Sequence, residues 1–476
     1  MSVNVIQEVL DSRSIAVVGA TPLGDWGGGG FLGGLVTLGY KGQVYPVNPQ
    51  YTEVMGLKTY ASLKDVPGTV DYVISSVPAR VVPGLLEEAA QKGVKTVHLF
   101  TARLAETGRP EAIELENRIL RLARESGIRL IGPNCMGVYY PKGGIAFHSV
   151  FSKESGSVAL ISQSGMLARE IVLDSADRGI HFSKVFSYGN AIDLNECDFL
   201  EYLAGDPDTG VIMAYVEGVK DGRRFFELLK RASAVKPVVV LKGGRGEAGT
   251  RATASHTASL AGAFRTWEAM VVQSGAVSAD SAEELIDLAA SFRSLPPITG
   301  RRVGVAGGAG GSSVLAADEC ERAGLNVIPL PPDLRDELRA RGISVWDWLS
   351  NPADTSIGED RSFSVGLVLE LMAKNRSFDV LIALMGMPGR MPRQPGVALE
   401  AILKEQYRLD VTMTKPLLVV VPDKSLGVKD LESRDLKMTA ELRTALASLG
   451  IPFFPTVRRA AFAAMKIADY HARKAR

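Results

Sequence analysis

The sequence predicts an α/β protein built from three doubly wound domains of the Rossmann or flavodoxin-like kind. Apolar runs typical of buried parallel strands alternate with helical patterns along the chain. Many of its 49 glycines follow these runs, where a backbone must turn tightly or approach a ligand. With 476 residues the chain is too long for one core, and roughly 150 residues per domain suggests about three domains.

The composition is that of an ordinary globular protein. Hydrophobic residues make up 46% and charged residues 22%, and the formal net charge is +1, so we expect neither nucleic acid nor a membrane as a partner. No apolar run reaches the roughly 18 residues that span a bilayer, and the first residues lack a signal-peptide core. The three cysteines are widely spaced without a metal-binding pattern, so we expect a cytoplasmic protein with no metal site.

The first domain is expected over residues 1–145. Its strands are predicted at residues 14–20, 43–49, 70–78, 96–102 and 129–135. The glycine-rich loop after the first strand runs on to residue 31, but it is neither GxGxxG nor a Walker A loop. The second strand ends in Asn48 rather than an acidic residue for an NAD ribose, which disfavours an NAD-dependent dehydrogenase. Helix-start amides and Lys41 could hold a phosphate here, or the glycines could simply serve tight turns.

A second domain is expected over residues 146–296 and a third over residues 297–476, with a linker at residues 295–300. Strand patterns lie at residues 156–165, 184–191, 210–218 and 236–244, and later at residues 379–386 and 416–423. Residues 301–324 have the pattern of a strand, a glycine loop and a helix. Two glycine-rich helix starts, around Ser164 and Gly308, offer amides that can bind an anion. The same signal occurs at many α/β turns, so neither is specific by itself.

His256 lies in residues 243–262, a stretch rich in glycine, alanine and small polar residues. Such a setting suits a mobile surface loop rather than a core. Together with the two glycine-rich helix starts, it makes His256 a candidate to carry a phosphoryl group between two active sites. A phosphohistidine needs amides around its dianion and an acceptor for its other ring nitrogen. Glu217, at the end of a predicted buried strand, is the candidate acceptor, and capping of the next helix is its alternative role. His98, in an apolar strand, is expected to pack in the core.

Eight motifs, in this order along the chain, resemble those of the NDP-forming acyl-CoA synthetases, relatives of succinyl-CoA synthetase. They are GAT (residues 19–21), YPVNP (45–49), SSVPA (75–79), GPNCMGV (132–138), SQSGMLA (162–168), SYGNAIDL (187–194), YVEG (215–218) and SHTASLAG (255–262). Each motif is modest alone, but eight in order are specific. The likeness covers essentially the whole chain and is strongest to the α subunits of ADP-forming acetyl-CoA synthetases.

This resemblance implies the reaction acyl-CoA + ADP + phosphate ⇌ carboxylic acid + CoA + ATP. It further implies that an acyl phosphate phosphorylates His256 and that Glu217 orients the phosphohistidine. The implied phosphate-binding residues are Ser164, Gly165, Met166, Gly308, Ala309 and Gly310, and the acyl group is implied to lie beside Gly189 and Asn190. The residues implied to bind coenzyme A are Gly19, Ala20, Thr21, Lys41, Asn48, Val77, Pro78, Asn134 and Cys135.

The chain departs from the family pattern in three ways. Residues 24–31 are unusually rich in glycine, and TARLAETG (residues 101–108) replaces the usual small-Gly-Phe sequence, which brings Arg103 near the implied acyl pocket. The family's ATP-grasp domain is not found in this sequence. The resemblance therefore implies an ATP-grasp β subunit that binds ADP or ATP with Mg²⁺ in an α2β2 heterotetramer, and a small carboxylic acid, acetate by default, as substrate. A non-catalytic CoA-binding regulatory protein is the alternative, which the retained histidine loop and Glu217 disfavour.

Overall fold

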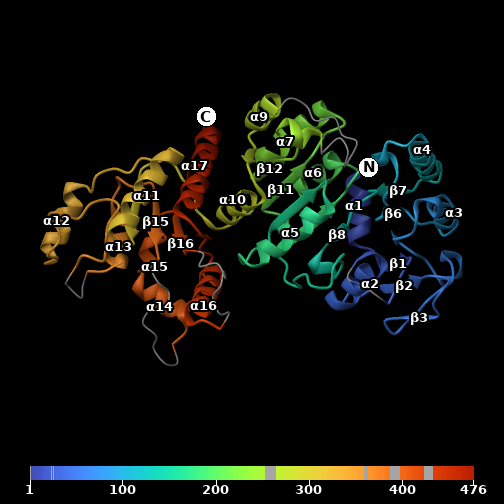
Figure 1. The fold of residues 1–476 in the computed structure, drawn as a ribbon, viewed down its shortest axis with the longest axis horizontal. Coiled ribbons are helices and arrows are strands. Elements are labelled where there is room, and N and C mark those ends of the chain that lie inside the picture. Colours follow the sequence, from blue (N-terminus) through green and yellow to red (C-terminus); the bar gives the residue numbers. More distant parts are fainter. Residues whose placement is uncertain are drawn as a thin grey trace. The chain divides into compact units, whose positions relative to one another are not determined.

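In a computed structural model of the chain, the described residues are 2–22, 24, 26–251, 264–358, 363–385, 397–422 and 432–475. The chain divides into two compact units, Met1–Leu285 and Ile286–Arg476 (Figure 1). Among the described residues, the first unit holds two large sheets and the second holds one, all of them mainly parallel, which confirms the α/β fold class. The boundary between the units falls inside helix α10 (Ala282–Ser294), and the three domains expected over residues 1–145, 146–296 and 297–476 stay a prediction.

The first sheet is parallel throughout, in the order β2-β1-β5-β6-β7. Its strands are β1 (Ser14–Val18), β2 (Gln43–Val47), β5 (Tyr72–Ser75), β6 (Thr96–Leu99) and β7 (Arg129–Ile131), with a short hairpin of β3 (Glu53–Val54) and β4 (Leu57–Lys58) after β2. Its helices are α1 (Ser2–Leu10), α2 (Gly27–Leu38), α3 (Val82–Gln91) and α4 (Pro110–Glu125). All five residues of β1 are buried, as expected for a central strand covered on both faces.

The second sheet has the order β13-β12-β11-β9-β10-β8, and β8 is its one antiparallel strand. Its strands are β8 (Gly137–Tyr139), β9 (Val158–Ser162), β10 (Phe182–Ser187), β11 (Val211–Val216), β12 (Val238–Lys242) and β13 (Val277–Ala279). Helices α5 (Gly165–Ala176), α6 (Glu196–Gly205), α7 (Gly222–Val235) and α9 (Phe264–Gln273) cover it. Because the strand order reverses at β9, right-handed crossovers put α5 on one face and α6, α7 and α9 on the other.

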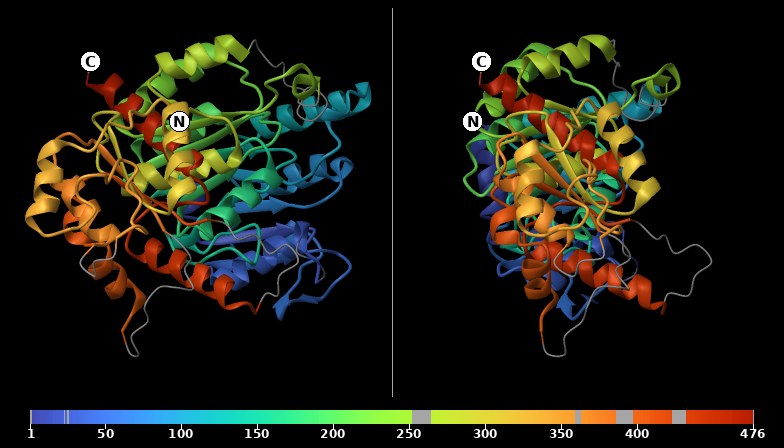
Figure 2. Two further views of the ribbon diagram at one scale, coloured as in Figure 1. Left: turned by 60° about the vertical axis from the view of Figure 1, so that its left-hand side comes forward. Right: turned by 90° about the vertical axis from the view of Figure 1, so that its left-hand side faces the viewer.

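The second unit repeats the plan around a parallel sheet of order β14-β15-β16-β17. Its strands are β14 (Val303–Gly307), β15 (Val380–Leu384), β16 (Leu417–Val420) and β17 (Phe453–Phe454). Its helices are α11 (Gly310–Ala323), α12 (Pro332–Ala340), α13 (Val365–Lys374), α14 (Leu399–Gln406), α15 (Leu409–Thr412), α16 (Arg434–Ser448) and α17 (Val457–Lys474). Figure 2 shows the same elements from two further directions.

Helix α2 corrects one expectation. The sequence predicts a loop up to residue 31, but the helix already begins at Gly27. An added Cβ at Gly28 would lie 1.9 Å from the carbonyl oxygen of Gly19, and one at Gly34 would lie 2.4 Å from that of Ala146. Gly28 therefore lets the helix backbone lie directly against the loop after β1, and Gly34 lets it lie against the backbone of Ala146. This close packing outweighs the poor helix propensity of glycine.

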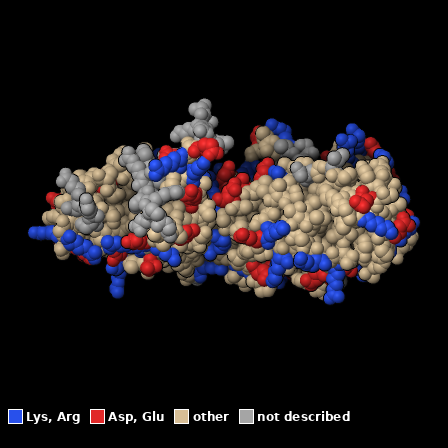
Figure 3. Space-filling model, turned by 90° about the horizontal axis from the view of Figure 1, so that it is seen from below, with Lys and Arg blue, Asp and Glu red and all other residues tan. Residues whose placement is uncertain are grey.

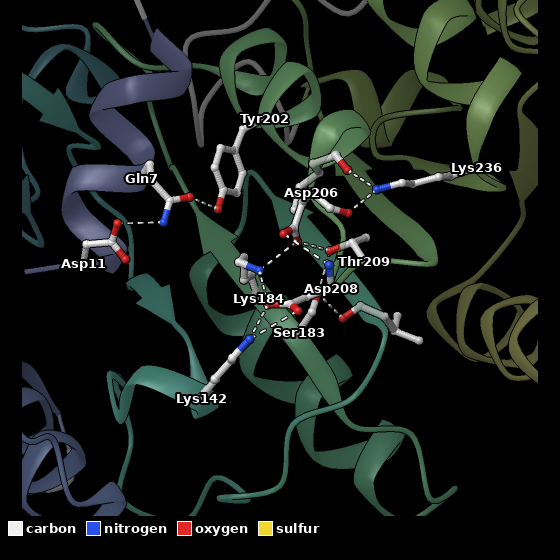
Figure 4. Close-up of polar contacts among 12 residues, drawn as sticks. Gln7, Asp11, Lys142, Ser183, Lys184, Tyr202, Asp206, Asp208, Thr209 and Lys236 are labelled. Atoms are coloured by element: carbon white, nitrogen blue, oxygen red, sulfur yellow. Dashed lines mark hydrogen bonds and ion pairs between the residues drawn. The ribbon is translucent and has the colours of Figure 1, made fainter.

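A buried ion pair stabilises the amino-terminal end of β10 (Figure 4). Lys184 Nζ lies 2.7 Å from Asp206 Oδ2, and the two side chains are only 2% and 4% exposed. The Thr209 hydroxyl donates to the same carboxylate oxygen at 2.5 Å, and Asp208 lies 3.5 Å from Lys184 Nζ. Charges buried this deeply are tolerated because each has several partners, so we assign the cluster a structural role.

Surface charge is mixed on the face seen in Figure 3, where Lys and Arg are interspersed with Asp and Glu. This pattern agrees with the formal net charge of +1. Among the described residues, every helix falls short of the length and apolar character that crossing a bilayer requires.

The close approach of α2 predicts a sharp difference between two glycines of one helix. Gly28→Ala should lower the free energy of unfolding by about 2 kcal/mol or more, because its Cβ overlaps the backbone of Gly19. Gly33→Ala is the matched control, since its Cβ would have no neighbour nearer than 3.8 Å. That variant should be as stable as the wild type or gain up to about 1 kcal/mol. Urea denaturation measures both, and equal midpoints would contradict the close packing of α2 on Gly19.

Candidate functional site

The centre of the candidate site is the switch point between β9 and β11, where the strand order reverses. Gln163 follows β9 directly, and its side-chain Oε1 accepts hydrogen bonds from the backbone N–H of Glu217 at 2.6 Å and of Gly218 at 3.0 Å. Gln163 is 4% exposed, so little water can compete for these amides. The two bonds fasten the loop after β11 to the loop after β9 and so fix the position of Glu217.

Glu217 is a buried carboxylate at the end of β11, with 4% of its surface exposed. The Tyr215 hydroxyl donates to its Oε1 at 3.2 Å, and Lys242 Nζ donates to its carbonyl oxygen at 2.7 Å. Burial lowers the pKa of Lys242, and the nearby Glu217 raises it in part. The N-cap residue of α7 is Asp221, whose side chain accepts the backbone N–H of Arg224. The capping role is therefore disfavoured for Glu217.

The start of α5 lies next to Glu217. The Ser164 side chain accepts a hydrogen bond from the backbone N–H of Leu167 at 3.3 Å and so caps the helix. Gly165 packs closely against the preceding segment, since an added Cβ would lie 2.7 Å from Cγ of Met136. Met166 is 49% exposed. The first amides of a helix have no partner within it, so this turn can receive an anion.

The loop after β10 closes the other side of the site. The backbone N–H of Asn190 donates to the carbonyl oxygen of Pro133 at 3.0 Å, and its side-chain Nδ2 donates to Glu106 Oε2 at 2.8 Å. Gly189 has a φ of +54°, and an added Cβ would lie 2.2 Å from the Pro133 carbonyl oxygen. The loop therefore packs tightly on residues 132–135 and carries Asn190 towards the segment after β6.

The loops after β1 and β5 meet at the switch point of the first sheet. Gly19 has a φ of +87°, and an added Cβ would lie 2.5 Å from the carbonyl oxygen of Ser76, so the position requires glycine. Asn48 Nδ2 donates to the carbonyl oxygen of Ala20 at 2.8 Å. These contacts bring together most of the residues expected to bind CoA, namely Gly19, Ala20, Thr21, Asn48, Val77 and Pro78.

The segment after β6 joins this set to the second sheet. The Thr101 hydroxyl donates to the carbonyl oxygen of Val77 at 2.8 Å, and the backbone N–H of Asn134 donates to the carbonyl oxygen of Thr101 at 2.8 Å. Asn134 is therefore held beside the loop after β5. Cys135 follows it, but its side chain is buried and burial raises the pKa of its thiol. A ligand at this edge would meet the backbone of Cys135 rather than its sulfur.

The strand register separates Lys41 from this set. Lys41 precedes β2, whose first residue, Gln43, pairs with Ser14 at the start of β1. Lys41 therefore lies at the amino-terminal edge of the sheet, a strand length away from Gly19. His98 lies in β6, where it is buried and its ring packs edge-on against Phe31 at a centroid distance of 5.3 Å, as expected for a core residue.

Sequence reasoning missed a buried acid and a lysine beside the Gly189–Asn190 loop. Glu196, the first residue of α6, is 1% exposed, and its Oε1 has no hydrogen-bond partner among the described residues. Burial raises its pKa to about 7. Lys220 Nζ donates to the carbonyl oxygen of Ala191 at 2.7 Å; burial lowers its pKa, and Glu116 and Glu196 raise it in part. The only sequence signal for both was their position shortly after a predicted strand.

The second unit contains the other helix start. Gly308, Ala309 and Gly310 lead into α11, and the backbone N–H of Gly310 donates to Asp354 Oδ2 at 2.6 Å. Burial would raise the pKa of Asp354, but bonds from Ser356 and from the Gly310 amide bring it below its ordinary value. This helix start thus already holds one carboxylate. His256 lies outside the described residues.

The buried Glu196 predicts an unusual pH dependence of stability. Its carboxyl has an ordinary pKa of 4.5 and a pKa of about 7 in the folded chain, so between these values the folded chain holds a proton that the unfolded chain loses. Stability of the wild type should therefore fall as pH rises through this window. Glu196→Gln removes this titrating carboxyl, so the free energy of unfolding of the variant should not fall in this way. Between the two pKa values it should gain roughly 3 kcal/mol relative to the wild type. Parallel curves of unfolding free energy against pH would contradict the burial assigned to Glu196.

Comparison with known protein families gives matches along most of the chain. A pattern described as a CoA binding domain matches residues 13–141, and a succinyl-CoA ligase like flavodoxin domain matches residues 155–292. A Ligase-CoA domain matches residues 303–382. The first two matches contain the switch points of the first and second sheets, and the third contains the start of α11.

Individual proteins give longer matches. The chain is 38% identical to the Acetate–CoA ligase [ADP-forming] II subunit alpha of Pyrococcus furiosus, over 80% of this chain and 82% of that protein. It is 40% identical to the Acetate–CoA ligase [ADP-forming] of Methanocaldococcus jannaschii over 65% of this chain but only 43% of that longer protein.

A solved structure is similar over nearly its whole length. It is the acetyl-coenzyme A synthetase 1 of Ca. Korarchaeum cryptofilum, described as dinucleotide forming and solved with phosphate and ADP. The TM-score is 0.78 at 30% identity, and the match covers 98% of this chain and 97% of that one. The sequence matches and this structural match agree, and the chain belongs to the family of NDP-forming acyl-CoA synthetases that includes the ADP-forming acetate–CoA ligases.

Proposed function

We propose that this chain is the CoA-binding and phosphohistidine-carrying α subunit of an ADP-forming acyl-CoA synthetase. The reaction is acyl-CoA + ADP + phosphate ⇌ carboxylic acid + CoA + ATP, and the names of the relatives support acetate as the acid. The observation that carries the proposal is the convergence of Glu217, the α5 start and the Asn190 loop at one sheet edge. The loops within the CoA binding match lie directly beside them.

The chemistry needs two displacements in the ATP-forming direction. An oxygen of phosphate attacks the thioester carbon, the carbon–sulfur bond breaks, and CoA leaves to give an acyl phosphate. A ring nitrogen of His256 then attacks phosphorus, the bond from phosphorus to the acyl oxygen breaks, and the carboxylate leaves. Helix-start amides at Gly165 and Met166 suit the phosphoryl charge. The helix start at Gly308, Ala309 and Gly310 in the second unit is also proposed to bind phosphate.

The buried carboxylate of Glu217 is suited to be the hydrogen-bond partner of the His256 imidazole. An anion beside an imidazole favours the protonated ring and can accept a hydrogen bond from the nitrogen that does not carry phosphate. Gln163 holds the backbone amide of Glu217 and not its carboxylate, so the residue is positioned without using the side-chain oxygens for this purpose. We propose the carboxylate as the group that orients the phosphohistidine.

The nucleotide is proposed to bind to a second chain. The chain matches most of a protein named subunit alpha but less than half the length of the Methanocaldococcus jannaschii relative. We propose that an ATP-grasp β subunit supplies the rest, holds ADP or ATP with Mg²⁺, and forms an α2β2 heterotetramer in the cytoplasm. Lys41 stays a prediction within the CoA set, since it lies at the opposite sheet edge from the other members.

Two sources of label test the phosphoryl transfer. Acetyl-CoA with radiolabelled phosphate should label the chain alone, because both displacements use its own residues. Labelled ATP should label it only with the ATP-grasp partner present. The label should be stable in base, labile in acid and absent from His256→Ala. Glu217→Gln should cut the labelling rate by at least about tenfold, since it removes the anion beside the imidazolium.

His181→Ala is the matched control for the loss of a histidine. His181 pairs with Glu154 at 3.0 Å, away from the strand ends that form the site, so this variant should label like the wild type. Label that persists in His256→Ala would refute the role of that residue. CoA binding without any label, from either source and with the partner present, would favour the non-catalytic CoA-binding protein instead.

A further inference from the structure

Unfavourable backbone conformations gather around the candidate site. Arg103, Asn134 and Ala191 have positive φ angles of 68°, 56° and 53°, a region that side chains with a Cβ rarely occupy. All three lie on the loops that meet beside Asn190. Strain of this kind persists where the surrounding structure enforces it and is common at functional sites. Arg103 is the unusual member, because a long charged side chain gains nothing from this backbone conformation.

Hydrogen bonds hold the backbone of Arg103 between the loop that carries Asn190 and the loops that carry the residues expected to bind CoA. Its backbone N–H donates to Glu106 Oε1 at 2.5 Å, and the other oxygen of Glu106 accepts Nδ2 of Asn190 at 2.8 Å. Two residues earlier, the carbonyl oxygen of Thr101 accepts the N–H of Asn134. The backbone of Arg103 is thus fixed beside Asn190 on one side and beside the CoA loops on the other.

The guanidinium of Arg103 is available to a ligand. Its side chain is exposed, and it makes no hydrogen bond or ion pair with the residues that the structure describes. The nearby Glu106 carboxylate does not use it, because both oxygens already accept N–H groups from Arg103, Leu104 and Asn190. A guanidinium binds carboxylate and phosphate oxygens through two parallel hydrogen bonds.

We propose that Arg103 is a specificity residue that binds an anionic oxygen group of a bound substrate. This inference rests on the proposed function, which puts an acid and coenzyme A at this edge. Two sources carry such a group besides the reacting carboxylate: an acid with a second carboxylate, and the phosphates of coenzyme A. With a second carboxylate as the source, the site prefers dicarboxylic acids to acetate.

Arg103→Gly in the complex with the ATP-grasp partner tests this proposal. Glycine suits the φ of +68°, so the variant should have a Tm no lower than the wild type and any loss of activity should not reflect misfolding. A fall of at least about tenfold in kcat/KM for succinate, with acetate unchanged, identifies the acid as the source. A similar rise in KM for CoA with both acids identifies coenzyme A.

Two further variants sharpen the result. Arg103→Lys keeps the charge without the paired donors and should fall between wild type and Arg103→Gly. Arg109→Ala removes an exposed arginine of the same loop whose backbone has an ordinary φ of −80°, and it should behave as wild type. The proposal is overturned if Arg103→Gly keeps the wild-type kcat/KM for succinate and the wild-type KM for CoA. It is also overturned if Arg109→Ala changes either constant as much as Arg103→Gly does.

A binding measurement separates this proposal from the proposed function. If the wild-type complex forms no acyl-CoA from any acid, the proposed function fails. The role of Arg103 can still be tested by the increase in Tm that CoA or succinate gives to the chain alone. An increase that Arg103→Gly abolishes supports the anion contact. An increase that survives in Arg103→Gly, or no increase in the wild type, overturns it.

Discussion

The site depends on two hydrogen bonds that the backbone N–H groups of Glu217 and Gly218 donate to one side-chain oxygen of Gln163. Parallel pairing brings the ends of β9 and β11 to one edge, but it does not fix the loops that follow. Gln163 does this from a buried position, where unpaired amides would be costly. The start of α5 and the buried carboxylate of Glu217 are thereby held beside each other, as a helix-start anion site with a neighbouring imidazole partner requires.

Buried polar and charged groups are satisfied to different degrees at the two ends of the second sheet. At the amino-terminal end, Lys184 and Asp206 satisfy each other with help from hydroxyl groups, so the cluster is closed. At the carboxyl end, Oε1 of Glu196 and the hydroxyl of Tyr188 are buried without partners among the described residues. Unsatisfied polar groups lower stability, and the presence of these two beside the Asn190 loop agrees with a site that binds a polar ligand.

The sequence was a good guide wherever local pattern decides structure. Long apolar runs such as β9 and β11 were predicted, because a strand covered on both faces must be apolar throughout. Short strands such as β13 and β17 were missed, since two or three residues carry no periodic signal. The early start of α2 was missed because Gly28 and Gly34 are explained by the backbones of Gly19 and Ala146, which lie against them and are distant in sequence or outside the helical pattern. The contacts of Gln163 and the burial of Glu196 likewise depend on residues distant in sequence, whereas the separation of Lys41 follows from strand register.

Transfer of one labelled oxygen from the acid to phosphate tests the central claim most directly, which is that the reaction passes through an acyl phosphate. The assembled enzyme would be given acetate labelled with ¹⁸O in the carboxyl group, together with ATP and CoA, and the products examined by mass spectrometry. An acyl phosphate gives inorganic phosphate that contains one ¹⁸O, because the acyl oxygen stays on phosphorus when CoA displaces it. Label in AMP with unlabelled phosphate would mean activation as an acyl adenylate and would contradict a route through an acyl phosphate and a phosphohistidine.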